Sequence, residues 1–214
     1  MKVLCLAILF CLNTAVNAVA QITTVVDYEE RVTPTETMLK DINPVARESL
    51  KASFKSSIRK CQLFFDRINN YYIKQGSISK SATKGTYEGS GAVQTRNDIT
   101  LSVCVAKSKI LKNEGCNCFF ESKENKKIKK QLEKSKWILS KENKKILGYQ
   151  CVKASSLFKN RNLVIFYTKQ IKGKASPNEY PFIDGVILEY NDGKRHGIAT
   201  KISFNQPDIK NFFD

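Results

Sequence analysis

Short runs of β-branched and aromatic residues, separated by turn residues, are the feature that most constrains this fold. Such runs recur from residue 98 to residue 204, and segments containing Asn, Gly or Lys divide them. This spacing is typical of an antiparallel meander. The clearest hairpin pairs residues 186–190 with 198–203 around an Asn-Asp-Gly turn at 191–193. The pattern predicts a mostly β, α+β fold: a single curved antiparallel β-sheet, or half-barrel.

The first half of the chain adds a strand and the clearest helical signal. Residues 22–32 alternate well enough to predict an opening strand. Apolar residues four positions apart predict a helix over 45–57, so one or two helices should pack on the sheet. Residues 75–92, rich in Gly, Ser, Thr and Lys, predict a loop or a weak hairpin. The Lys-rich stretch 123–136 predicts either a surface helix or a solvated loop.

The N-terminus has the pattern of a cleavable export signal. Lys2 precedes an uncharged apolar stretch over 3–12, and Ala18-Val19-Ala20 has the small-x-small form that signal peptidases accept. The apolar stretch is short for a membrane-spanning helix, although a single membrane anchor is the competing interpretation. We therefore expect a signal peptide over 1–20, cleaved after Ala20, and a single domain over 21–214. The mature chain should be periplasmic or secreted.

The charge of the chain is strongly positive. Lys and Arg number 36 against 20 Asp and Glu, a formal net charge of +16. Such an excess attracts polyanions such as lipopolysaccharide, acidic glycans or nucleic acid, although it also serves solubility. No nucleic-acid motif is visible, so specific nucleic-acid binding is not expected. The candidate polyanion residues are Lys126, Lys127, Lys129, Lys130, Lys134 and Lys136.

Five cysteines remain after the predicted signal peptide. In an oxidising compartment disulfides are the default, and an odd number leaves one thiol over. If Cys116 and Cys118 lie on one strand, their sulfurs share a face and could instead bind one soft metal ion. Free thiols are the third alternative. The candidates for disulfide or metal are Cys61, Cys104, Cys116, Cys118 and Cys151.

Catalytic motifs are absent from the sequence. His196 is the only histidine, and its surroundings, Asp-Gly-Lys-Arg-His-Gly, predict a hairpin turn and not a pocket wall. A Ser-His-Asp or Cys-His site would need this residue. No HExxH, phosphate-binding glycine loop or nucleophile elbow occurs. A pair of carboxylates remains open, but the balance favours a non-enzyme without a cofactor.

Residues 137–154 carry a family resemblance. They run Trp-Ile-Leu-Ser-Lys-Glu-Asn-Lys-Lys-Ile-Leu-Gly-Tyr-Gln-Cys-Val-Lys-Ala, which resembles the central block of the GLPGLI family, exported proteins found mainly in Bacteroidetes. Phe-Tyr-Thr at 166–168 is similar to that family's Trp-Tyr-Thr strand. The segment 180–189 lies where the family has its name-giving motif, and it keeps Gly185 and Ile187 but not the proline. The resemblance implies an exported β protein, without established catalysis, that accompanies TonB-dependent outer-membrane receptors.

Aromatic residues in these strands are the candidate ligand-binding positions. On a curved sheet they could line a face for an apolar or extended ligand, while core packing is the competing interpretation. The residues are Trp137, Tyr149, Phe166, Tyr167 and Tyr190.

The predicted function is a non-catalytic exported binding or accessory protein of the cell envelope. Its partner would be an envelope protein, a lipid or an extended peptide, bound through the concave face and its basic rim. The alternatives are a secreted polyanion binder and a cysteine-based metal-binding protein.

Overall fold

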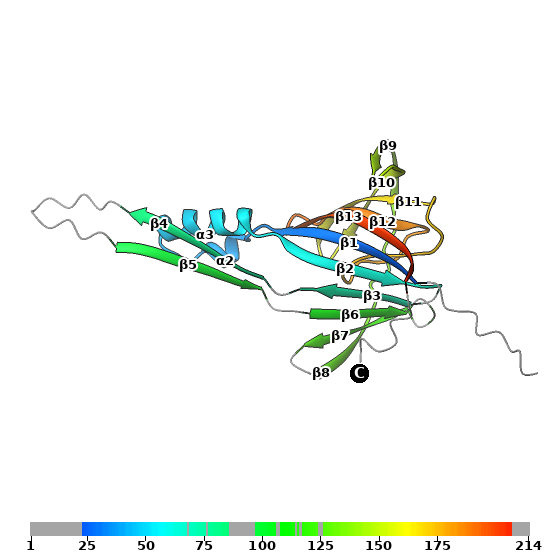
Figure 1. The fold of residues 1–214 in the computed structure, drawn as a ribbon, viewed down its shortest axis with the longest axis horizontal. Helices are drawn as coiled ribbons and strands as arrows, with labels where there is room; N and C mark the ends of the chain where they lie inside the picture. The colour runs from blue at the N-terminus through cyan, green and yellow to red at the C-terminus, as the bar shows by residue number, and fades with distance from the viewer. Residues whose placement is uncertain are drawn as a thin grey trace, which may run out of the picture.

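The chain folds around one large antiparallel β-sheet (Figure 1). The computed structural model describes residues 23–67, 69–75, 77–85, 97–105, 108–113, 115, 117–123 and 126–206. Within these residues eleven strands form one open sheet, two more form a separate hairpin, and two helices are present. The predicted fold class, a mostly β protein with one or two helices on a single antiparallel sheet, is confirmed.

The sheet consists of two meanders joined at its centre. Its strand order is β8 (Lys126–Gln131), β7 (Cys118–Lys123), β6 (Ser108–Asn113), β3 (Asn69–Lys74), β2 (Arg59–Phe65), β1 (Thr23–Val32), β13 (Arg195–Gln206), β12 (Val186–Asn191), β11 (Arg161–Thr168), β10 (Tyr149–Phe158) and β9 (Ile138–Ile146). The first described strand therefore pairs with the last, with Arg31 opposite His196. β8 and β9 are the two edge strands, at the bottom and top of the sheet in Figure 1.

The helices lie at one end of the sheet beside the separate hairpin. α2 (Glu36–Leu39) begins after Thr35, whose hydroxyl accepts a hydrogen bond from the Met38 amide at 3.4 Å. α3 (Pro44–Ser56) confirms the helix expected over 45–57. It contacts β1 and runs along β4 (Ser77–Gly85) and β5 (Asn97–Val105), as Figure 1 shows. For residues 77–85 the hairpin alternative is correct, and residues 86–92 lie outside the described part of the chain.

The expectation for residues 123–136 was wrong in its central part. Residues 126–131 form β8, not a helix or a loop, because its backbone pairs with β7 over the whole strand, from Cys118 opposite Gln131 to Lys123 opposite Lys126. Backbone pairing with a neighbour outweighs the low β-propensity of lysine. Among the described residues of that stretch, residues 132–136 lack regular structure.

The segment between β11 and β12, residues 169–185, packs onto one face of the sheet, here named the inner face. Asn70 on β3 holds it: its Nδ2 donates to the Lys174 carbonyl at 3.0 Å, and its Oδ1 accepts from the Ser176 amide at 3.0 Å. The segment ends at Gly185, whose φ is 147°. A Cβ there would stand 2.6 Å from the Thr168 carbonyl oxygen, so only glycine fits.

No helix in the described part of the chain is long and apolar enough to cross a membrane.

Candidate functional site

A buried polar network centred on Glu30 lies on the inner face of the sheet. The Glu30 side chain is fully buried, and its Oε2 accepts hydrogen bonds from the Tyr190 hydroxyl at 2.7 Å and from Asn178 Nδ2 at 3.4 Å. Arg59 Nη1 lies 3.1 Å from Glu30 Oε1. The Tyr190 and Tyr72 hydroxyls are 2.9 Å apart. Four strands, β1, β2, β3 and β12, thus meet through the side chains around one carboxylate.

Arg195 organises the other half of this network. Its Nη2 lies 3.2 Å from Glu179 Oε1 and 3.0 Å from Asp192 Oδ2. The Tyr180 hydroxyl and Arg161 also contact Asp192 Oδ2, at 3.0 and 3.2 Å. Burial is the largest single influence on both carboxyls and opposes their ionisation. The charge of Arg195 and its hydrogen bonds, acting together with other nearby donors and cations, outweigh burial and hold the pKa values of Glu179 and Asp192 below their usual range. Both carboxylates are therefore charged and paired.

Two buried lysines complete the inner face. Lys112 on β6 is fully buried, and its Nζ donates to the carbonyls of Ser176 and, at 3.2 Å, Tyr180. Burial lowers its pKa well below the usual value, and burial also lowers the pKa of Lys74. Lys112 therefore ties the 169–185 segment to the sheet, because that segment supplies both acceptors.

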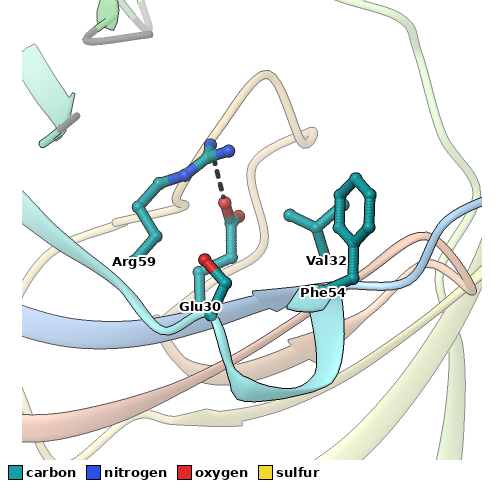
Figure 2. A pocket seen from close by; sticks show the side chains of 5 residues that line it. Glu30, Val32, Phe54 and Arg59 are labelled. Atoms are coloured by element: carbon teal, nitrogen blue, oxygen red, sulfur yellow. Dashed lines mark ion pairs between the residues drawn. The ribbon is translucent and has the colours of Figure 1, made fainter. Parts of the chain in front are cut away.

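A small hollow opens beside Glu30, where α3 passes the ends of β1 and β2. It is shallow and in part open to solvent, and it has room for about one water molecule, far less than an ordinary ligand pocket offers. Figure 2 shows the Glu30–Arg59 ion pair on one side and the apolar side chains of Val32 and Phe54 on the other. The lining residues are Glu30, Val32, Phe54, Ser57 and Arg59.

Of the network residues, sequence reasoning singled out only Tyr190, as a candidate ligand-binding position, and none of its partners. Glu30 and Tyr190 are 160 positions apart, and Glu30 and Asn178 are 148 apart. No local spacing joins them. The one available signal was the alternation of residues within each strand. Alternation predicts on which face of the sheet a side chain lies, but not which residue it contacts.

The predicted aromatic positions lie in or beside the core. Tyr190, Tyr167 and Phe166 are buried at 0%, 5% and 8% exposure and belong to the main hydrophobic cluster. Trp137 and Tyr149 pack against that cluster while partly exposed, and Trp137 Nε1 donates to the Phe182 carbonyl at 2.9 Å. The three buried rings therefore serve core packing, the competing interpretation. A ligand role for the five positions stays a prediction.

The cysteines divide into buried thiols and a disulfide. Cys61 and Cys151 are free, and burial raises the pKa of Cys61 to about 12 and that of Cys151 to about 11, so both are protonated. Cys118 is disulfide-bonded. Cys116 and the side chain of Cys104 lie outside the described part of the chain. Among the described residues, no group of three His, Cys, Asp or Glu could hold a metal ion.

The candidate lysines lie on and just after the β8 edge. Lys129, Lys130, Lys134 and Lys136 are exposed, and Lys130 forms an ion pair with Glu121 at 2.8 Å. The side chains of Lys126 and Lys127 are not among those described. His196 lies just past its predicted turn, as the second residue of β13, with its Nε2 3.3 Å from Glu189 Oε1.

The β9 edge exposes large apolar side chains. Ile138 and Leu139 at its start are 67% and 62% exposed, and Leu157 on the adjacent β10 is 68% exposed. Among the described strands β9 pairs only with β10, so its outer side has no strand neighbour. The other exposed residues of β9 are polar or charged. Large apolar side chains left exposed beside an open edge are a feature of partner-binding sites.

Fold and site together define a class: a domain of one large open antiparallel sheet, closed on its inner face by its own loop and a network of paired charges. A family model described as "N-glycanase peptide, N-terminal domain" (PNGase_F-II_N) matches residues 106–208. Crystal structures of PNGF-II in the C2 and P21 space groups are similar to the chain, each with a TM-score of 0.53, at 14% and 15% identity. The matches cover 87% and 90% of this chain but only 28% and 30% of the PNGF-II chains. The present chain therefore spans less than a third of the length of PNGF-II. At this identity the likeness shows the fold, and no curated protein matches.

Proposed function

We propose that the chain is a non-catalytic, exported binding or accessory domain of the cell envelope that holds an extended peptide segment of a partner protein along β9. The observation that carries this proposal is the exposed apolar edge formed by Ile138, Leu139 and Leu157. An extended peptide can add a strand to an open edge, with main-chain hydrogen bonds giving affinity and side-chain contacts giving specificity.

The charges of β9 suggest the chemistry of that peptide. Glu142 is paired with Lys153 at 2.6 Å, and Lys144 is paired with Glu189. Lys141 and Lys145 are exposed and form no ion pair with the described residues. The edge therefore offers uncompensated positive charge next to apolar side chains, which suits a segment that alternates acidic and apolar residues.

The inner face supports a role without catalysis. Glu30, Glu179 and Asp192 are each paired with an arginine, and the buried thiols of Cys61 and Cys151 are protonated. A catalytic base or nucleophile needs a group that can change its protonation state beside a substrate. Paired, buried charges of this kind stabilise a fold instead.

The wider context supports an accessory role. The matching family model describes an N-terminal domain, and the chain is similar to less than a third of the longer PNGF-II chain. The predicted export signal over 1–20 and the GLPGLI resemblance favour a periplasmic or secreted location and an outer-membrane TonB-dependent receptor as partner.

A peptide titration tests the proposal. The probe is a fluorescent ten-residue peptide that alternates Glu and Val, and its control alternates Lys and Val. The double variant Ile138→Ser, Leu139→Ser removes the apolar contact without adding charge and should weaken binding about tenfold or more, as expected when an apolar anchor is lost. The matched control is Ile128→Ser on the opposite edge, a residue 43% exposed, which should bind as the wild type does. Equal binding of the two peptides, or equal loss in both variants, would contradict the proposal.

A second candidate, polyanion binding, is favoured by the exposed lysines that follow one another on and after β8. Binding driven by released counterions falls steeply with salt. Heparin affinity should then drop sharply between low and physiological salt, and Lys129→Glu with Lys134→Glu should abolish it. Affinity that survives this charge reversal would exclude the β8 lysines as the site.

A further inference from the structure

The side of β9 that has no neighbour among the described strands offers main-chain hydrogen bonds over only part of its length. The Leu147-Gly148 turn, with φ values of 50° and 86°, joins Ile146 to its partner Tyr149 in a two-residue hairpin. In such a hairpin the two residues beside the turn exchange main-chain hydrogen bonds. The pairs that follow alternate between bonded and non-bonded.

Lys145 and Asn143 therefore belong to the non-bonded pairs of this hairpin. Their main-chain N–H and C=O groups point away from β10, toward the open side. A separate contact supports this assignment: the amide of Gln150, opposite Lys145, donates to Gln170 Oε1 at 2.8 Å, outside the hairpin. The open side thus offers two N–H and two C=O groups within three consecutive residues, here named the 143–145 window.

A bulge interrupts β9 on the far side of this window from the turn. Residues 140–142 together oppose Lys153 of β10, because the register of the pairing shifts there. The ion pair between Glu142 and Lys153, at 2.6 Å, holds the bulge against β10. Beyond the bulge β9 continues only through Leu139 and Ile138. Bulges commonly end strand pairing at the edge of a sheet.

The bulge also occupies its own main-chain groups. The Glu142 amide donates to Ser140 Oγ at 3.1 Å. The Lys141 carbonyl accepts a hydrogen bond from Asn143 Nδ2, also at 3.1 Å. An incoming strand would have to displace both contacts in order to pair across the bulge. The uninterrupted run of available main-chain groups therefore ends at Asn143.

We infer that the β9 edge receives a short extended segment of a partner protein, with about three residues in main-chain contact with the 143–145 window, and not a long strand. This inference rests on the function proposed above and narrows its partner. Past the bulge, the apolar side chains of Ile138 and Leu139 provide the remaining contact. A long strand, including β9 of a second copy, would lose its hydrogen bonds at the bulge, as edge strands that avoid open-ended pairing require.

A length series of the alternating Glu-Val peptide tests the inference on the full chain. The ten-residue peptide should bind no more than about threefold more tightly than a six-residue one, the statistical gain from its additional registers. Deletion of Ser140 and Lys141 removes the register shift and gives one continuous ladder. In that variant the longer peptide should bind about tenfold more tightly than the shorter one, because it gains further hydrogen bonds.

The matched control for the deletion is Lys141→Ser, which loses the same charge but keeps the bulge. It should show the wild-type ratio of the two affinities. A tenfold preference of the wild type for the longer peptide would overturn the inference, and so would a deletion variant that keeps the wild-type ratio.

Hydrogen exchange of the free protein tests the window without any peptide. The amides of Asn143 and Lys145 should exchange fast and that of Lys144 slowly, since of these three only Lys144 is bonded to β10. Ser140→Ala should speed exchange of the Glu142 amide about tenfold, whereas Ser140→Thr, which keeps the hydroxyl, should not. Slow exchange at Asn143 and Lys145, or no change at Glu142, would overturn the inference.

The two measurements separate the inference from the function on which it rests. If neither peptide binds, the function proposed for the β9 edge fails, and the amide exchange of the free protein still shows whether the 143–145 window exists. The same exchange rates decide if the deletion variant does not fold.

Discussion

The inner face and the β9 edge differ in which side chains they bury. The inner face buries charged side chains, and the β9 edge exposes apolar ones. On the inner face, charged side chains from three strands, β1, β3 and β6, are buried, and the carboxylates of Glu30, Glu179 and Asp192 are paired with arginine. At the β9 edge, apolar side chains stand more than half exposed. The first arrangement fixes strand and loop positions, and the second adds nothing evident to stability. This difference indicates that side chains at the centre of the sheet stabilise the fold. It also makes the β9 edge the place to test for a partner.

The largest effect should come from breaking the charge network at Arg195. Arg195→Met leaves Glu179 and Asp192 buried beside the apolar side chain, which should lower the free energy of unfolding by about 3–5 kcal/mol. Urea denaturation measures it. Lys159→Met is the control: Lys159 also pairs with Glu179, but its side chain is 51% exposed, so less than about 1 kcal/mol should be lost. Similar losses in both variants would show that the buried Arg195 contributes no more to the free energy of unfolding than the half-exposed Lys159 does.

Gly197 tests how tightly the inner face is packed. A Cβ there would overlap the ring of Tyr190, which must move and release Glu30 and Tyr72. Gly197→Ala should therefore cost about 3 kcal/mol of unfolding free energy. Gly193→Ala, in a turn at φ 79° with open space around it, should cost only about 1 kcal/mol. Reversal of this order would mean that the Tyr190 ring is not fixed.

The network also predicts how stability depends on pH. The pKa values of Glu179 and Asp192 are lowered in the folded state, so their contribution is present above the unfolded value of about 4 and is lost as pH falls below it. Wild-type unfolding free energy should fall from pH 5 to pH 3. In Glu179→Gln this fall should be smaller. Equal slopes in denaturation series at several pH values would show that Glu179 does not carry the effect.

The smallest effect on stability is expected at the edge. Ile138→Lys should change the free energy of unfolding by no more than about 0.5 kcal/mol, because the side chain is already 67% exposed. Thermal and urea denaturation measure this. A loss of several kcal/mol would show that Ile138 stabilises the fold as the inner-face residues do, and the two regions would no longer differ in their contribution to the free energy of unfolding.

Local signals in the sequence were enough for much of the fold. The expected hairpin joins β12 to β13, with its turn after Asn191, and the strand expected over 22–32 is β1. Each of these depends on residues close together in the chain. β8 was missed because its Lys-rich composition disfavours a strand, and only its pairing with β7 makes it one.

The candidate site could not be predicted in the same way. Glu30, Asn178 and Tyr190 meet only because β1 crosses the middle of the sheet and the 169–185 segment folds over it. Alternation within the strand singled out Tyr190, which is buried on the inner face. The same pattern fits a core residue and a ligand-lining residue equally well. The exposed edge at Ile138 depends on strand order, which composition does not reveal.

Hydrogen exchange with and without the alternating Glu-Val peptide tests the central claim most directly. In the free protein, amides on the outer side of β9 should exchange fast and those of β1 and β13 slowly, since only the latter lie between two strands. The account predicts that the peptide slows exchange in β9 and leaves β8 unchanged. Protection confined to β8, or no change in β9 at saturating peptide, would contradict it.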